Sequence, residues 1–233
     1  MALVGRDPDR LAKVAEFCSK RGALAETMAI DVSDGATLSD RLRDFDRQAA
    51  VDLVVANAGV LTGPPAEDAL DGLEQAAAQI RINLLGVVNT VEALAPMMVA
   101  RRSGQIAVVS STAALRGLPY IPAYSASKAG VRAYGEALRA RLEPFGVKVS
   151  VVVPSFFESA MTDRFDGPTP MIMSAEAAAQ RVRRGLDKGA ARIVFPRRIG
   201  LLMQLLDLLP ARLGDRLLRS NVRIRPASDG DGQ

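Results

Sequence analysis

Three side chains able to exchange a proton lie close together in the middle of the chain. Ser111 precedes Tyr124 by thirteen positions, and Lys128 follows the tyrosine four positions later. Side chains four residues apart share one face of a helix, so the phenol and the ammonium can act on the same substrate atom. A nearby cation favours the phenolate and lowers its pKa from about 10. The trio therefore predicts an acid–base site built on a tyrosine.

Composition narrows the chemistry further. The chain has no histidine and one cysteine, Cys18. Histidine triads, Cys-His pairs, histidine zinc sites and disulfides within the chain are therefore excluded, and no metal site is expected. A Tyr-x-x-x-Lys pair alone also fits a helix surface without chemistry. Because Tyr120 and Tyr134 lack a lysine four positions later, Tyr124 is the candidate acid or base.

The net charge of +4 is unevenly distributed. Residues 181–225 contain twelve Arg or Lys against three Asp, whereas residues 1–180 contain 18 basic and 21 acidic side chains. Aromatic residues make up only 4% of the chain, too few for a platform on which bases stack. Nucleic-acid binding is therefore not expected.

Apolar β-branched runs alternate with helical patterns, which is typical of an α/β fold with a parallel sheet. The expected strands are residues 2–5, 24–30, 51–56, 105–110, 147–153 and 191–195. The expected helices are residues 7–20, 35–48, 67–100, 123–143 and 174–188. We expect one domain over residues 1–220, a disordered tail over 221–233 and, without an export segment, a cytoplasmic location.

Small or polar residues follow five of the expected strands. They are Arg6-Asp7, Asp31-Val32, Asn57-Ala58-Gly59, Ser110-Ser111 and Pro154-Ser155. The carboxyl ends of parallel strands meet at one edge of a sheet, where nucleotides bind. The pattern predicts a dinucleotide crevice at this edge.

In this order and spacing, the motifs resemble the short-chain dehydrogenase/reductase family of the single-domain type, from Leu3 to about residue 200. The resemblance implies a Rossmann-like doubly wound parallel sheet and a catalytic set of Asn83, Ser111, Tyr124 and Lys128. It implies cofactor contacts by Arg6, Asp31, Val32, Asn57, Ala58, Gly59, Tyr124, Lys128, Pro154, Phe157 and Ser159. It also implies a homodimer or homotetramer formed through helices 67–100 and 123–143.

The chemistry implied by the family is hydride transfer between a nicotinamide and a carbonyl carbon, with Tyr124 giving its proton to the oxygen. Ser111 would hydrogen-bond that oxygen, and Lys128 would lower the pKa of Tyr124 and hold the nicotinamide ribose. Asn83 would anchor a water that relays protons to Lys128. In the reverse direction a secondary alcohol is oxidised.

Cofactor and substrate class are predicted from fewer residues. Arg6 suits the 2′-phosphate of NADP, whereas an acidic residue there would favour NAD. NADP is therefore predicted, with NAD as the alternative because Asp7 adjoins Arg6. Residues 160–173, with Met161, Phe165, Met171 and Met173, predict a mobile apolar lid and hence an apolar carbonyl or alcohol.

The beginning of the chain departs from the family pattern. The family's first strand and its glycine-rich turn, which cradles the pyrophosphate, have no counterpart, and Met1 falls within the family's second strand. We expect the sheet to be interrupted between the strands that normally flank the missing one. Two explanations stay open: a chain that starts further upstream, or a degenerate, non-catalytic member acting as a scaffold.

The segment 199–210 is apolar nearly all round and lies within the basic region. One interpretation is a helix packed on the domain or on a second subunit. The other is peripheral attachment of residues 199–225 to an anionic membrane surface, or gating of a lipid-like substrate.

Overall fold

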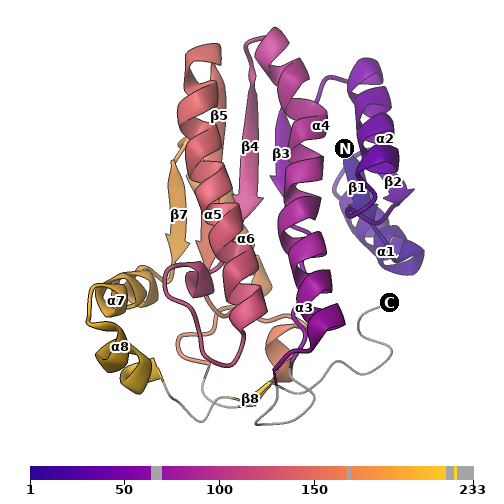
Figure 1. Ribbon diagram of the computed structural model, residues 1–233. Helices are drawn as coiled ribbons and strands as arrows, with labels where there is room; N and C mark the ends of the chain where they lie inside the picture. The colour runs from indigo at the N-terminus through magenta and orange to yellow at the C-terminus, as the bar shows by residue number, and fades with distance from the viewer. Residues whose placement is uncertain (64–69, 167–168, 219–222, 225–233) are drawn as a thin grey trace.

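The computed structural model describes residues 1–63, 70–166, 169–218 and 223–224 (Figure 1). Four parallel strands form its main sheet in the order β3 (Leu53–Ala56), β4 (Gly104–Val109), β5 (Val147–Pro154) and β7 (Arg192–Phe195). A separate parallel pair contains β1 (Ala2–Gly5) and β2 (Glu26–Ala29). The predicted Rossmann-like α/β fold is confirmed.

Helices cover both faces of the main sheet. The helices are α1 (Pro8–Ser19), α2 (Gly35–Gln48), α3 (Leu73–Ile80), α4 (Gly86–Ala100), α5 (Pro122–Leu142), α6 (Ala175–Asp187), α7 (Arg197–Asp207) and α8 (Ala211–Leu218). Helices α4 and α5 lie in front of the sheet and α6 lies behind it (Figure 1). Alternation of strand and helix along the chain thus gives a doubly wound arrangement.

The core between the main sheet and the front helices consists of aliphatic side chains. Val91 and Met98 of α4 are fully buried against Ile106 and Val108 of β4. Helix α5 lies close to the sheet at Gly135. A Cβ on this residue would come within 2.5 Å of Val108 and 2.8 Å of Val151, so only glycine fits there. Such dense packing fixes the height of α5 above the sheet.

Sequence signals account for where several helices begin. The Asp7 side chain accepts hydrogen bonds from the backbone N–H groups of Asp9 and Arg10, and Pro8 occupies the first helical position. Asp34 and Ser174 cap α2 and α6 in the same way. These side chains satisfy amide groups that have no partner within the helix.

The helix that runs from Leu73 to Ala100 is long and apolar enough to cross a membrane by length and composition alone. It lies between α2 and α5 (Figure 1) and contributes Val87, Val91 and Met98 to the core. Its position is that of a core helix in an α/β domain, which explains its apolar composition.

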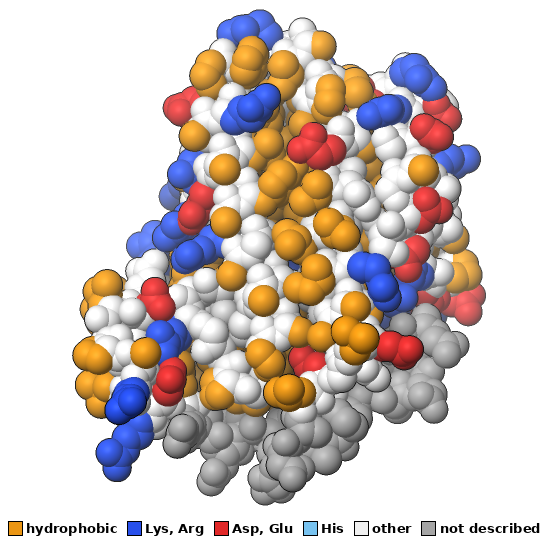
Figure 2. Space-filling view, viewed as in Figure 1, with side chains coloured by type: hydrophobic (Ala, Val, Ile, Leu, Met, Phe, Trp, Pro, Cys, Tyr) orange, Lys and Arg blue, Asp and Glu red, His pale blue; other side chains and the backbone are white. Residues whose placement is uncertain are grey.

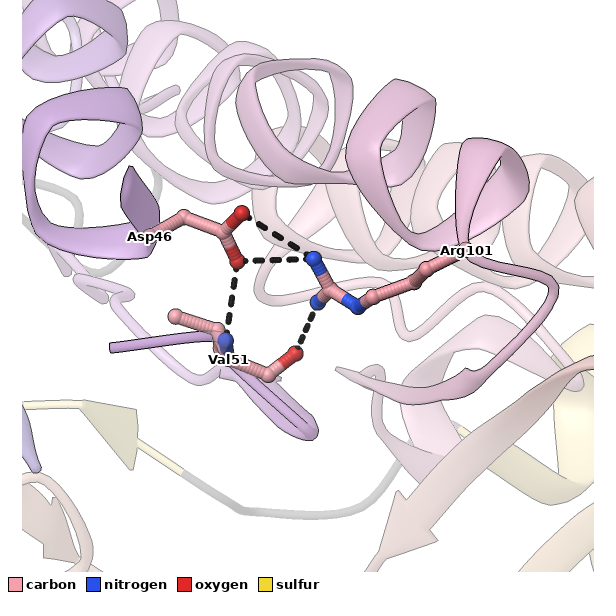
Figure 3. A network of polar contacts seen from close by, with 3 residues as sticks. All are labelled: Asp46, Val51 and Arg101. Atoms are coloured by element: carbon pink, nitrogen blue, oxygen red, sulfur yellow. Dashed lines mark hydrogen bonds and ion pairs between the residues drawn. The ribbon is translucent and has the colours of Figure 1, made fainter. Parts of the chain in front are cut away.

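A buried polar network joins the β1–β2 side of the molecule to the main sheet (Figure 3). The Arg101 guanidinium donates to both carboxylate oxygens of Asp46 in α2, at 3.0 Å each, and also to the Val51 carbonyl. The Val51 N–H donates to Asp46 at 2.8 Å. The Asp46 side chain is only 8% exposed. One ion pair therefore ties α2, the end of α4 and the chain entering β3.

The sheet is interrupted between β1 and β3. No strand pairing among the residues the structure describes joins β1 to β3, so each has one strand neighbour (Figure 1). On the rear face of β3, Leu53 and Val55 are 44% and 47% exposed. The interruption lies where the sequence predicts it.

The expected strands and helices agree with the structure within a few residues, and the differences have local causes. The single helix predicted over 67–100 begins at Leu73 and contains a π-helical turn at Arg81–Leu85, while residues 67–69 lie outside the described residues. The expected tail contributes a two-residue strand, β8 (Arg223–Ile224), which pairs with β6 (Phe165–Asp166). The rest of 221–233 lies outside the described residues, so the disordered tail stays a prediction.

Candidate active site

The catalytic candidates come together at the carboxyl end of β4. Ser111 follows this strand, and Tyr124 and Lys128 lie on consecutive turns at the start of α5. Pro122 at the first turn leaves no N–H to satisfy and directs the chain into the helix. The Lys128 ammonium lies 5.8 Å from the centre of the Tyr124 ring.

Lys128 is held tightly by the end of β4. Its side chain is 3% exposed, and its Nζ donates to the Val109 carbonyl at 3.0 Å. The Ser110 hydroxyl donates to the Lys128 carbonyl at 2.7 Å, which fixes the helix to the strand. Burial disfavours the ammonium and lowers the pKa of Lys128 to about 8. Ser110 was not predicted as a site residue, because a serine after a strand resembles any turn.

Tyr124 is held in its protonated form. Burial raises its pKa above the usual value of 10.0, and a hydrogen bond from the Ser111 side chain acts in the opposite direction. The net direction is therefore opposite to the lowering predicted from Lys128, because the effect of burial on the pKa of Tyr124 is the larger one. The ammonium is engaged by a backbone carbonyl and is too far from the ring to outweigh loss of water.

Asn83 lies in the π-helical turn and is fully buried. Its Oδ1 accepts from the Val60 N–H at 2.7 Å, and its Nδ2 donates to the Val60 carbonyl at 2.9 Å and to Ser127 Oγ at 3.1 Å. The extra residue of a π-turn redirects side chains and is frequent at functional sites. The amide thus joins the loop after β3 to α5.

A cavity of about 680 Å³ opens along the ends of β1 and β3. Predicted cofactor residues line it: Arg6, Asn57, Ala58 and Gly59. A Cβ on Gly59 would come within 3.2 Å of Lys128 Nζ and 3.4 Å of Asn83 Oδ1, so glycine keeps open the space in front of both groups. The size, a largely apolar lining that includes three arginines and Asn57, and this open approach fit a nicotinamide dinucleotide.

The other cofactor candidates lie around this cavity or apart from it. The Asp31 carboxylate lies 3.7 Å from the Arg6 guanidinium. Arg6 lines the cavity, so Asp31 lies next to its edge. Val32 is buried, and a Cβ on Gly86 would overlap it, so its side chain packs in the core. The structure thus gives Val32 a packing role where a cofactor contact is predicted.

The candidates after β5 also have local partners. Pro154 is buried at the end of the strand. The Phe157 carbonyl accepts from the Thr162 hydroxyl at 2.6 Å, and Ser159 Oγ lies 3.0 Å from the same hydroxyl. None of these three residues lines the cavity. Ser159 stabilises a turn in this structure, because its hydroxyl also accepts from the Thr162 N–H.

An apolar cluster adjoins the phenol. Buried Leu61, Ala113 and Ile121 pack with Tyr124 and with Met161 and Phe165 of the predicted lid. The other two lid candidates differ: Met171 is 49% exposed, and Met173 packs against the core beside α6. Arg164 has no motif that would predict it, yet it lines the cavity and donates to the Leu61 carbonyl at 2.5 Å.

The chain is similar in sequence to known oxidoreductases. An uncharacterized oxidoreductase of Myxococcus xanthus is 33% identical over 216 residues, covering 92% of this chain and 85% of that protein. A 3-ketodihydrosphingosine reductase of Bacteroides thetaiotaomicron is 34% identical over 137 residues, covering 58% of this chain and 50% of that protein.

Two solved structures share the fold over most of the chain. A 3-ketoacyl-ACP reductase from Sinorhizobium meliloti aligns with a TM-score of 0.74 at 24% identity, covering 86% of this chain and 89% of that one. A Burkholderia cenocepacia gluconate 5-dehydrogenase in complex with NADP and tartrate aligns with a TM-score of 0.63 at 27% identity, covering 70% and 63%.

Residues 1–168 match the short chain dehydrogenase family. The matched region contains the ends of β1 and β3, the π-turn with Asn83, and the Ser111, Tyr124 and Lys128 side chains. The chain therefore belongs to the short chain dehydrogenase family of nicotinamide-dependent oxidoreductases.

Proposed function

We propose that the protein transfers a hydride between NADP(H) and the carbonyl or secondary alcohol carbon of an apolar substrate. The observation that carries this proposal is the placement of Ser111 after β4 and of Tyr124 and Lys128 on consecutive turns of α5, with the phenol at the edge of an apolar cluster. A carbonyl oxygen placed between the Ser111 and Tyr124 hydroxyls would receive a hydrogen bond from one and a proton from the other.

Tyr124 is the proton donor in the reducing direction. Burial keeps its phenol protonated near neutral pH, which suits an acid that gives its proton as charge develops on the carbonyl oxygen. Ser111 donates to the same oxygen, and the Lys128 ammonium stabilises the resulting phenolate. A reduced nicotinamide, when bound, supplies the hydride that the carbonyl carbon receives.

Arg6 supports the choice of NADP. Its guanidinium lies at the end of β1, lines the cavity and is oriented by Asp31 at 3.7 Å. Guanidinium groups bind phosphate through paired N–H donors, whereas ribose hydroxyls are better bound by a carboxylate. Asn57 and Gly59 would hold the part of the cofactor nearest Lys128. The B. cenocepacia neighbour contains NADP, which agrees with this choice.

Two observations support an apolar substrate. The residues around the phenol are Leu61, Ala113, Ile121, Met161 and Phe165, which offer few polar partners to a ligand. The B. thetaiotaomicron relative is a 3-ketodihydrosphingosine reductase, so a ketone on a long alkyl chain is a reasonable first substrate.

Assembly through α4 and α5 forms part of the proposal. A band of hydrophobic side chains runs down the front face over these two helices (Figure 2). Tyr134 of α5 donates to Glu92 of α4 at 2.8 Å, which holds the two helices at a fixed spacing. Sedimentation velocity at several concentrations tests for the homodimer or homotetramer.

NADPH consumption with a panel of apolar ketones and aldehydes, including 3-ketodihydrosphingosine, tests the function. We expect saturable turnover that is faster with NADPH than with NADH. Lack of NADPH binding by cofactor fluorescence, together with no turnover, would contradict the proposal and favour a non-catalytic scaffold.

A further inference from the structure

A basic hollow lies behind the main sheet, away from the catalytic groups. Its volume is about 400 Å³, and α6, β7 and α7 form its walls. Arg181, Arg184 and Lys188 share one face of α6 through their spacing and line the hollow together with Arg197 of α7. All four side chains are on exposed residues.

These four cations have no acidic partner among the described residues. Within the part of the chain that the structure describes, no ion pair joins any of them to a carboxylate, whereas their neighbours Arg183 and Arg192 pair with Asp187 and Glu136. Four like charges around one hollow repel one another unless an anion enters. Several guanidinium groups converging on a small space are well suited to a phosphate.

An apolar surface adjoins the hollow. Leu201 lines the hollow and also begins an exposed stripe along one face of α7. Hydrophobic side chains gather over α7 and α8 at the lower left of Figure 2. The stripe and its continuation on α8 consist of leucines that are 47% to 80% exposed: Leu201, Leu202, Leu205, Leu208, Leu213 and Leu217.

The leucine surface is rigidly attached to the domain. On the inner face of α7, Met203 is buried, and Gly200 fits against Val194 of β7. Arg116, in the segment between Ser111 and Tyr124, pairs with Asp207 at 3.6 Å and Asp215 at 2.5 Å. The leucines therefore remain exposed because the opposite side of each helix is already packed.

Exposed leucines beside unpaired cations define the chemistry of the partner. A bilayer interface accepts apolar side chains into its acyl boundary and offers phosphates at the depth of the headgroups. We propose that α6, α7 and α8 form a docking surface for an anionic phospholipid bilayer, with a headgroup phosphate held by Arg181, Arg184, Lys188 and Arg197.

Vesicle flotation of the full-length chain tests the docking surface. We expect the protein to float with vesicles of phosphatidylcholine and phosphatidylglycerol, but not with phosphatidylcholine alone, and to be released by high salt. The triple charge reversal Arg181→Glu, Arg184→Glu, Lys188→Glu should weaken partitioning at least ~100-fold, since each basic residue contributes about fivefold. A matched control reverses three exposed charges elsewhere: Lys13→Glu, Arg43→Glu, Arg141→Glu.

A second variant measures how much the exposed leucines, as distinct from the basic residues, contribute to membrane binding. Leu202→Ser with Leu205→Ser should reduce flotation while leaving thermal unfolding unchanged, because these side chains are exposed. Equal loss in the control triple variant, or wild-type protein that fails to float with anionic vesicles, would overturn the proposal. So would self-association in sedimentation velocity that the Leu202→Ser, Leu205→Ser variant abolishes, because the leucine surface would then be covered by a second copy. NADPH turnover with a water-soluble ketone should be the same in all these variants, which keeps this test independent of the proposed function.

Discussion

The four-stranded sheet and the β1–β2 pair hold their functional residues to very different degrees. Seven of the eight residues of β5 are buried, whereas no residue of β1 and only Met28 of β2 is buried. Lys128 is fixed by Val109 and Ser110 at the end of the sheet, but Arg6 lies on the exposed pair and contacts Asp31 at 3.7 Å. The catalytic geometry thus depends on the four-stranded sheet, whereas the contact proposed between Arg6 and the cofactor depends on the β1–β2 pair.

This separation implies separable effects of mutation. Changes on the four-stranded side should lower kcat, and changes on the β1–β2 side should raise the KM for the cofactor. Changes in the network of Asp46, Val51 and Arg101, which joins the two parts, should lower the free energy of unfolding.

The largest effect is expected at the phenol. Tyr124→Phe removes the proton donor but keeps the ring in its apolar cluster, so kcat should fall by roughly 10²- to 10⁴-fold. NADPH binding, followed by cofactor fluorescence, should change little. Tyr134→Phe is the matched control, because this phenol bonds Glu92 on the helix surface and should keep its turnover.

The next largest effect is expected on stability, at the ion pair between Asp46 and Arg101 that joins the two parts. Arg101→Met leaves the Asp46 carboxylate buried without its cation and should lower the free energy of unfolding by roughly 3 kcal/mol, measured by denaturant titration. Arg41→Met breaks an exposed pair with Glu26 and should cost less than about 1 kcal/mol. Equal losses in the two variants would remove the structural importance assigned to the Figure 3 network.

The third effect concerns pH and Lys128. Its pKa is lowered from 10.5 to about 8, so between these pH values the unfolded chain binds more protons than the folded one. The free energy of unfolding should therefore rise with pH in this window, by about 3 kcal/mol relative to Lys128→Met, and this gain should vanish as pH falls through 8. Parallel stability curves for the two proteins would show that Lys128 is not desolvated.

The smallest effect is expected at Arg6. Arg6→Ala should raise the KM for NADPH about tenfold and leave the KM for NADH nearly unchanged, because only the former has a 2′-phosphate. Steady-state kinetics with both cofactors checks this, with Lys13→Ala of α1 as the control. A fall in kcat instead would show that the two parts of the fold are coupled.

The sequence predicts the fold well because its signals are local. Asp7-Pro8 and Ser174 mark helix starts, and β-branched runs such as 147–153 favour buried strands. The π-turn around Asn83 is different, because its extra residue depends on packing between the loop after β3 and α5.

The sequence predicts which residues form the candidate site better than it predicts their pKa values. Spacing brings Ser111, Tyr124 and Lys128 together, but the pKa of Tyr124 depends on burial and on where the lysine donates. Val32 packs against Gly86 and Ser159 bonds Thr162 in a local turn, so the cofactor contacts predicted for both residues stay predictions.

Deuteride transfer tests the central claim most directly. Wild-type protein and Tyr124→Phe are incubated with NADPH carrying deuterium at the transferable position of C4 and with the panel of apolar ketones, and the alcohols are analysed by mass spectrometry. We predict deuterium on the carbinol carbon with the wild type and at least 10²-fold less with the variant. Equal labelling by both proteins, or none by the wild type with any ketone, would contradict the assignment of Tyr124 as the acid of a hydride-transfer site.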